Sequence, residues 1–200
     1  MRRCGNAQIY IYIYIYIMLL LLALSGCAAA PEAGQAKITR IEPDGTALAY
    51  AEMLGGENII AAEYSVPGTK SLTVEIQRHD GDGWSASARS VEFPNISDEG
   101  VLLLSFDSLA GGFGAAVLQP DGIEQVLHSA AEADEAPPTE YYGIVFMPES
   151  EPLNGGEDTA AAMQYYVGPE GEILADIEDY ARPESLGGYE AVYALVVRFE

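Results

Sequence analysis

The chain has 200 residues, and its 31 Asp and Glu residues outnumber its 9 Lys and Arg residues, for a formal net charge of −22. This balance argues against a nucleic-acid partner, because phosphate contacts need Lys and Arg to displace counterions. It argues equally against electrostatic attraction to an anionic membrane. The acidic residues are spread along the whole chain, which is typical of a solvated surface that keeps a secreted protein soluble.

The first 27 residues contain the three parts of a secretory signal in order. Arg2 and Arg3 form a short basic start, residues 9–24 are an unbroken apolar run, and small residues lead to Cys27. Secretory signals have a basic start, an apolar segment and small residues at the cleavage site. The sequence therefore predicts a signal peptide, in the form of an apolar helix, over residues 1–26.

The end of this segment, Leu24-Ser25-Gly26-Cys27, resembles the lipobox of a bacterial lipoprotein signal peptide. The resemblance implies a diacylglyceryl group on the sulfur of Cys27 and cleavage before it. Fatty acyl chains would then anchor the protein in the membrane, on its extracytoplasmic face. A membrane-spanning helix is the alternative, since about 20 apolar residues span a bilayer. No basic cluster follows Cys27, and this favours the lipoprotein.

Cysteine usage agrees with this interpretation. Cys4 and Cys27 are the two cysteines of the sequence; the first would be discarded and the second lipidated, so the mature protein could form no disulfide or cysteine metal site. Residues 28–36, AAAPEAGQA, consist mostly of small residues and predict a flexible tether. Nine extended residues reach about 30 Å.

From Lys37 onward, short apolar runs alternate with turn sequences, which is typical of β-structure. Leu72, Val74 and Ile76 alternate with polar residues, as expected for a half-buried antiparallel strand. Residues 189–199 are apolar on nearly both faces, which predicts a central strand. We therefore expect an all-β fold, an antiparallel β-sandwich that is Ig-like or jelly-roll-like and built from hairpins.

Four turn sequences, such as Pro43-Asp44-Gly45, lie between candidate strands. An acidic side chain bonds the local backbone in such a turn, and Gly accepts a positive φ. The expected hairpins are Lys37–Glu42 with Thr46–Met53, Ser71–His79 with Trp84–Val91, Gly114–Gln119 with Ile123–His128, and Ala162–Val167 with Glu172–Ile177. Further strands are expected at Ile59–Val66, Val101–Phe106 and Tyr141–Met147. Apolar residues in Glu172–Ala181 also fit helical spacing, but the preceding turn favours a strand.

Residues 129–138 are acidic, rich in Ala and end in two prolines, so they are predicted to form a linker or a long exposed loop. This segment divides the β region into a larger unit, 37–128, and a smaller unit, 139–200. Whether the two units form one sandwich or two stays open. Residues 70–84 and 103–122 resemble uncharacterised secreted β-sandwich lipoproteins of Gram-positive bacteria, which implies a fold and no assigned activity.

Candidate chemistry is sparse. The sequence contains no HExxH, GxSxG or cysteine-pair motif, so we expect no catalytic residue and no cofactor. Asp80 and Asp82 resemble half of a calcium loop, but the remaining ligands are missing and a plain hairpin turn is favoured. Tyr142 and Tyr165 are candidate binding residues, because exposed rings stack on sugars and peptides.

These observations favour a lipid-anchored, non-catalytic binding or structural module of the cell envelope. Its partner is the membrane, through the lipid anchor, and its further ligand is an unspecified protein or glycan. Two alternatives stay open, namely an envelope hydrolase that uses carboxylates on glycans, and a calcium-stabilised adhesion domain.

Overall fold

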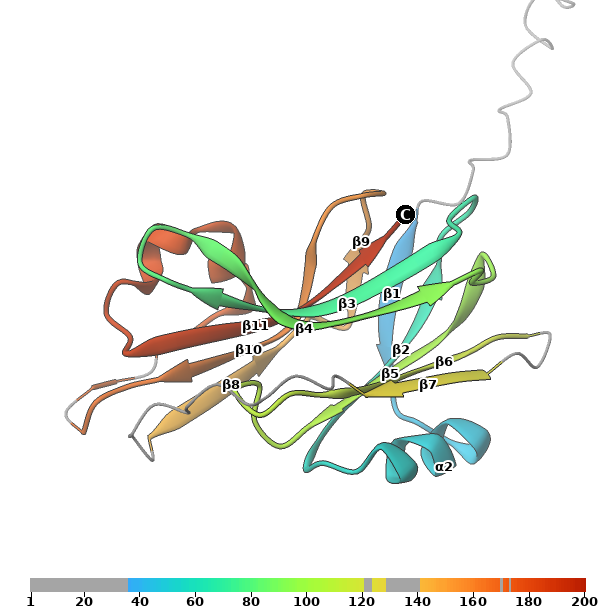
Figure 1. Ribbon diagram of the computed structural model, residues 1–200, viewed down its shortest axis with the longest axis horizontal. Helices are drawn as coiled ribbons and strands as arrows, with labels where there is room; N and C mark the ends of the chain where they lie inside the picture. Colours follow the sequence, from blue (N-terminus) through green and yellow to red (C-terminus); the bar gives the residue numbers. More distant parts are fainter. Residues whose placement is uncertain (1–35, 121–123, 129–140, 170, 173) are drawn as a thin grey trace, which may run out of the picture. The chain divides into compact units, whose positions relative to one another are not determined.

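The computed structural model describes residues 36–120, 124–128, 141–169, 171–172 and 174–200. These residues form two antiparallel β-sheets (Figure 1), which confirms the predicted all-β sandwich. The predicted signal peptide, Cys27, the tether and the linker 129–138 lie outside the described residues. In the part of the chain that is described, no helix is both long and apolar enough to cross a membrane.

The first sheet has six strands in the order β7-β6-β5-β2-β1-β9, and the second has five in the order β4-β3-β11-β10-β8. The strands of the first sheet are β1 (Lys37–Ile41), β2 (Asn58–Ser65), β5 (Glu99–Phe106), β6 (Gly114–Leu118), β7 (Glu124–His128) and β9 (Ser150–Pro152). Those of the second are β3 (Ser71–His79), β4 (Trp84–Pro94), β8 (Tyr142–Phe146), β10 (Thr159–Tyr166) and β11 (Ala191–Phe199).

The hydrophobic core lies between the inner faces of the two sheets. Leu102 and Leu104 of β5 belong to the same buried cluster as Leu72 and Ile76 of β3 and Leu195 of β11. The predicted alternation in β3 is confirmed, because side chains two residues apart point to the same face of a strand. The predicted hairpin β3–β4 is present, and β6 pairs with the described part of its expected partner, β7.

Strand β11 lies in the middle of the second sheet, as its sequence predicts, between β3 and β10. Tyr193, Leu195 and Val197 face the main core. Val192 and Val196 belong to a second buried cluster, which also contains Leu186 from the segment that precedes β11. Both faces of β11 are therefore covered, and this explains why its sequence is apolar on both.

Strands from both sides of residues 129–138 pair in both sheets. β1 pairs with β9 in the first sheet, and β3 pairs with β11 in the second. The question left open by the sequence, whether residues 37–128 and 139–200 form one sandwich or two, is thus answered: they form a single sandwich.

The strand expected at Thr46–Met53 is wrong, because helix α2 (Gly45–Leu54) occupies this position. Ala, Leu, Met and Glu are strong helix formers, and Ala47 and Ala51, four residues apart, fall on the same side of the helix. This side packs against Leu103 and Ala116 of the first sheet. Asp44 therefore precedes a helix, and its carbonyl accepts a hydrogen bond from the Leu48 N–H at 3.1 Å.

The strand expected at Glu172–Ile177 is also wrong. β10 is already paired with β8 on one edge and with β11 on the other, so no edge of β10 is free for a further hairpin partner. The chain instead forms two 3₁₀ helices, η1 (Ile177–Ala181) and η2 (Pro183–Leu186). The helical spacing noted as the alternative for this segment agrees with its structure better than the favoured strand does.

Candidate functional site

A groove of about 790 Å³ lies between η1 and the strands β8, β9 and β10. Its apolar lining comes from both sides, and it carries acidic side chains from β9, from the start of β10 and from η1. The lining residues are Phe146, Pro148, Glu151, Asp158, Thr159, Ala160, Asp176, Ile177, Glu178, Tyr180, Ala181 and Arg182. This volume is in the range of small-molecule sites, about 300–1,000 Å³.

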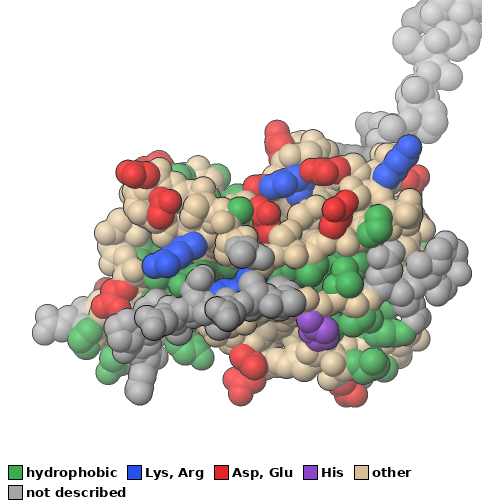
Figure 2. Space-filling model, in the orientation of Figure 1, with side chains coloured by type: hydrophobic (Ala, Val, Ile, Leu, Met, Phe, Trp, Pro, Cys, Tyr) green, Lys and Arg blue, Asp and Glu red, His purple; other side chains and the backbone are tan. Residues whose placement is uncertain are grey.

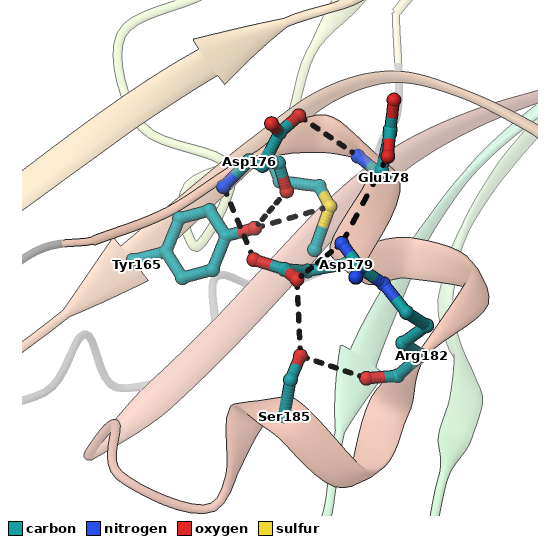
Figure 3. Close-up of polar contacts among 7 residues, drawn as sticks. Tyr165, Asp176, Glu178, Asp179, Arg182 and Ser185 are labelled. Atoms are coloured by element: carbon teal, nitrogen blue, oxygen red, sulfur yellow. Dashed lines mark hydrogen bonds and ion pairs between the residues drawn. The ribbon is translucent and has the colours of Figure 1, made fainter.

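One wall of the groove belongs to residues 176–186, here called the cap segment. Figure 3 shows how Asp176 and Asp179 begin it with a reciprocal capping box. The Asp176 side chain accepts a hydrogen bond from the Glu178 N–H at 3.2 Å, and Asp179 accepts one from the Asp176 N–H at 3.1 Å. These bonds satisfy N–H groups that the first turn of a helix would otherwise leave without partners.

Asp179 also ties the two 3₁₀ helices together. Its Oδ1 atom accepts hydrogen bonds from Arg182 Nη2 at 3.2 Å and from Ser185 Oγ at 3.1 Å (Figure 3). Glu178 is 79% exposed and lies 3.9 Å from Arg182, which is 55% exposed. An exposed pair of this kind contributes about 0–1 kcal/mol, so Asp179 holds Arg182 and Glu178 contributes little.

The cap segment is fixed to the second sheet by two hydrogen bonds to its backbone. Tyr165 donates its hydroxyl to the Asp176 carbonyl at 2.8 Å, and Trp84 donates its indole N–H to the Tyr180 carbonyl at 2.9 Å. The rings of Trp84 and Tyr180 also stack, with centroids 5.0 Å apart. Leu186 is buried in the cluster beneath the cap segment. These hydrogen bonds, the ring contact and the burial of Leu186 hold the cap segment, which forms one wall of the groove, against the second sheet.

A polar network connects Tyr180 with the floor of the groove. The Tyr180 hydroxyl donates to Gln77 Oε1 at 2.8 Å and lies 3.3 Å from Asp158 Oδ2. Asp158 also accepts hydrogen bonds from Gln77 Nε2 at 2.9 Å and from Arg198 Nε at 2.6 Å. Both carboxylate oxygens of Asp158 are therefore engaged by neighbouring side chains. A charge-assisted network of this kind positions residues firmly.

Burial raises the pKa of the Tyr180 hydroxyl above its ordinary value, and the charge of Asp158 raises it further. Burial and the charge of Asp179 likewise raise the pKa of Tyr165. Both shifts favour the neutral hydroxyl in the folded protein. The two neutral hydroxyls contribute their full stabilisation below pH about 10, the ordinary tyrosine pKa. This stabilisation is lost as the pH rises above that value, because the unfolded chain then binds fewer protons than the folded one.

We expect Tyr180→Phe to lower the free energy of unfolding by about 1 kcal/mol at neutral pH, because it removes the hydroxyl that Gln77 and Asp158 share. Tyr142→Phe is the control, since Tyr142 is 52% exposed and should change stability by less than about 0.5 kcal/mol. Urea unfolding at pH 7 and above pH 10 measures both variants. An alkaline loss of stability as large in a Tyr165→Phe, Tyr180→Phe variant as in the wild type would contradict the assignment.

The candidate residues Asp80 and Asp82 lie in the β3–β4 turn. Asp80 Oδ1 accepts hydrogen bonds from the N–H groups of Asp82 and Gly83 at 3.1 and 3.3 Å, and Gly81 has a φ of +96°. The carboxylate thus closes the turn in the manner that Asp side chains favour. Among the described residues, no group of three or more His, Cys, Asp or Glu side chains is placed to hold a metal ion.

The candidate binding residues Tyr142 and Tyr165 lie in different environments. Tyr142 is exposed on edge strand β8, with its ring centroid 6.0 Å from that of Tyr166. Tyr165 is 0% exposed, so the expectation of an exposed ring at this position is wrong. Tyr165 is buried under the cap segment and Tyr166 in the main core on the opposite face of β10, whereas Tyr141 and Tyr142 are both exposed.

Sequence reasoning did not find the groove. Glu151, Asp158 and Tyr180 come from three separate segments and follow no motif. The helical spacing within Glu172–Ala181 is the one signal that could have indicated a wall formed by helical turns over the sheet. No family model matches this chain, and neither the curated proteins nor the solved structures contain a significant match. The fold and groove define a β-sandwich with a capped outer face and an acidic, partly apolar groove.

Proposed function

We propose that this chain is a lipid-anchored extracytoplasmic protein, and that its β-sandwich is a non-catalytic binding or structural module of the cell envelope. The observation that carries the proposal is the order of segments. The lipobox ends at Cys27, residues 28–36 follow, and the first strand, β1, begins at Lys37. A tether of this length lifts a folded module off the membrane surface by up to about 30 Å.

The contacts of Asp158 and Asp176, two of the four carboxylates that line the groove, favour a structural over a catalytic role for these two. A glycosidase needs two carboxyl groups that exchange protons with the substrate or attack it. Both oxygens of Asp158 accept hydrogen bonds from Arg198 and Gln77, and Asp176 begins the cap segment. These two carboxylates therefore serve to hold the walls of the groove. A recognition surface with fixed walls agrees with a binding module.

The acidic surface supports an exposed location for the sandwich. Asp and Glu side chains are spread over the face in Figure 2 and outnumber Lys and Arg in the sequence. If residues 1–26 were removed, Arg2 and Arg3 would be lost and the net charge of the remaining chain would be more negative than −22. Mutual repulsion between such modules keeps them apart and soluble, so the lipid would be the attachment to the membrane.

The test of the anchor is Cys27→Ala. One acyl chain binds a membrane marginally, whereas two hold it stably, so Cys27→Ala should remove the lipid anchor, and an uncleaved chain would keep the apolar residues 9–24 instead. We expect cells that express this variant to accumulate an unprocessed precursor without incorporated radiolabelled fatty acid. Cys4→Ala is the matched control, because it removes the other cysteine and should leave processing and labelling unchanged. Cleavage after residue 26 together with wild-type labelling of Cys27→Ala would refute the proposed anchor.

A further inference from the structure

The lining of the groove combines apolar side chains with charge that is mostly negative. Phe146, Pro148, Ala160 and Ile177 contribute apolar surface. A long cationic side chain suits such a surface, because Lys and Arg bury their methylene stems along apolar groups while the charged head stays in contact with water.

Two of the four carboxylates that line the groove make no strong ion pair with the described residues. Asp158 is held by Arg198, and Asp176 caps the cap segment. Glu178, on η1, makes only the weak 3.9 Å pair with Arg182. Glu151, on β9, has no ion pair with any other described residue. Glu151 from β9 and Glu178 from η1 thus contribute negative charge to the lining of the groove from two separate segments.

The chain's own arginines show the chemistry that this region accommodates. The Arg198 guanidinium bonds Asp158 at 2.6 Å, and the guanidinium carbon of Arg40 lies 6.0 Å from the centroid of the Phe146 ring. Carboxylate pairing and contact with an aromatic face are the two ways in which proteins commonly recognise a guanidinium. The region around the groove therefore already uses both.

We propose that the groove binds a Lys or Arg side chain of an extracellular peptide, with the stem against Phe146 and Ile177 and the charged head between Glu151 and Glu178. The proposal rests on the proposed function as a binding module and names its ligand class. Charge complementarity favours a cationic peptide over a neutral glycan, because a glycan could hydrogen-bond to these carboxylates but would form no ion pair with them.

Trp84 provides a built-in reporter for this test. It is the single tryptophan of the chain, and its ring stacks on Tyr180, which lines the groove. The experiment titrates the full chain, held in nonionic detergent micelles, with acetyl-tetra-arginine-amide and follows Trp84 emission. Acetyl-tetra-glutamate-amide and chitotetraose are the anionic and glycan probes. We expect Trp84 emission to change in a saturable way with the tetra-arginine peptide and not with the other two probes. The affinity for the tetra-arginine peptide should be weaker at higher salt.

Two double variants with the same change in net charge separate a groove site from general attraction. Glu151→Gln, Glu178→Gln should weaken tetra-arginine binding about tenfold, since each exposed charge contributes modestly. Glu63→Gln, Glu99→Gln is the matched control. Its residues line a separate depression on the first sheet with Lys37, and binding should stay within twofold of wild type.

Three results would overturn the proposal. These are equal weakening by both double variants, a saturable response to chitotetraose in place of tetra-arginine, and the absence of a saturable response to any probe. The result is independent of the Cys27→Ala test, which measures lipidation and processing. Failure of the groove site and failure of the proposed anchor are therefore distinguishable.

Discussion

Replacing Gly100 by Ala should lower the free energy of unfolding by about 1–3 kcal/mol, the usual cost of overfilling a packed interior. A Cβ atom at this position would lie 2.5 Å from the Tyr64 hydroxyl oxygen and 2.7 Å from the Leu118 carbonyl oxygen. Tyr64 is opposite Gly100 in the β2–β5 register. The tyrosine ring thus occupies the space that a side chain on β5 would need.

The Leu118 carbonyl makes this clash costly. It belongs to β6, which pairs with β5 next to Gly100, so relief would require a shift of strand backbone. Gly188→Ala is the control, because a Cβ atom there meets no heavy atom within 4 Å. Urea unfolding followed by far-ultraviolet circular dichroism compares the two variants. Equal stability of Gly100→Ala and the wild type would contradict this prediction, because it would mean that β5 and β6 can shift at this position without loss of free energy of unfolding.

A loss of about 2 kcal/mol is expected for Gln164→Leu, although leucine is similar in size and apolar. Gln164 on β10 is 1% exposed, and its Oε1 atom accepts hydrogen bonds from the Leu109 N–H at 2.7 Å and from Ser108 Oγ at 3.3 Å. Leu109 is itself buried. The substitution leaves a buried backbone N–H without its partner, and such a group costs about 1–3 kcal/mol.

Ser108→Ala is the control for this second variant, because it removes one hydroxyl and keeps the bond between Gln164 and the Leu109 N–H. Its expected loss is about 1 kcal/mol. Hydrogen exchange distinguishes the two directly. The Leu109 amide should lose its protection in Gln164→Leu and retain it in Ser108→Ala. Equal protection in both variants would contradict the role given to Gln164.

The parts of the fold that sequence reasoning predicted are those that local periodicity determines. The alternation of Leu72, Val74 and Ile76 fixes the buried face of β3, and the continuous apolar run of β11 indicates burial on two faces. Thr46–Met53 forms a helix in place of the expected strand, because its Ala-rich pattern has no strong strand signal and Pro43-Asp44-Gly45 suits a helix start as well as a hairpin. The small side chains of Ala47 and Ala51, both buried, let the helix lie close against the first sheet.

The groove depends on contacts that no local pattern contains. Tyr180 bonds Gln77, which is 103 positions earlier, and the indole of Trp84 bonds the Tyr180 backbone across 96 positions. The strand expected at Glu172–Ile177 failed for a related reason, since the two partners of β10 come from segments before and after it. Such placement follows from strand order, which turn chemistry alone does not determine.

The position of β11 bears on how the protein acquires its structure during synthesis. Among the described strands, β11 alone joins the β3–β4 hairpin to the β10–β8 pair in the second sheet. Until the chain has emerged as far as Phe199, these two pairs have no common neighbour, and their edges next to the missing strand expose unpaired backbone groups. Long-range pairing of this kind forms slowly. The protein therefore passes through an interval of synthesis in which its open edges need protection from other chains.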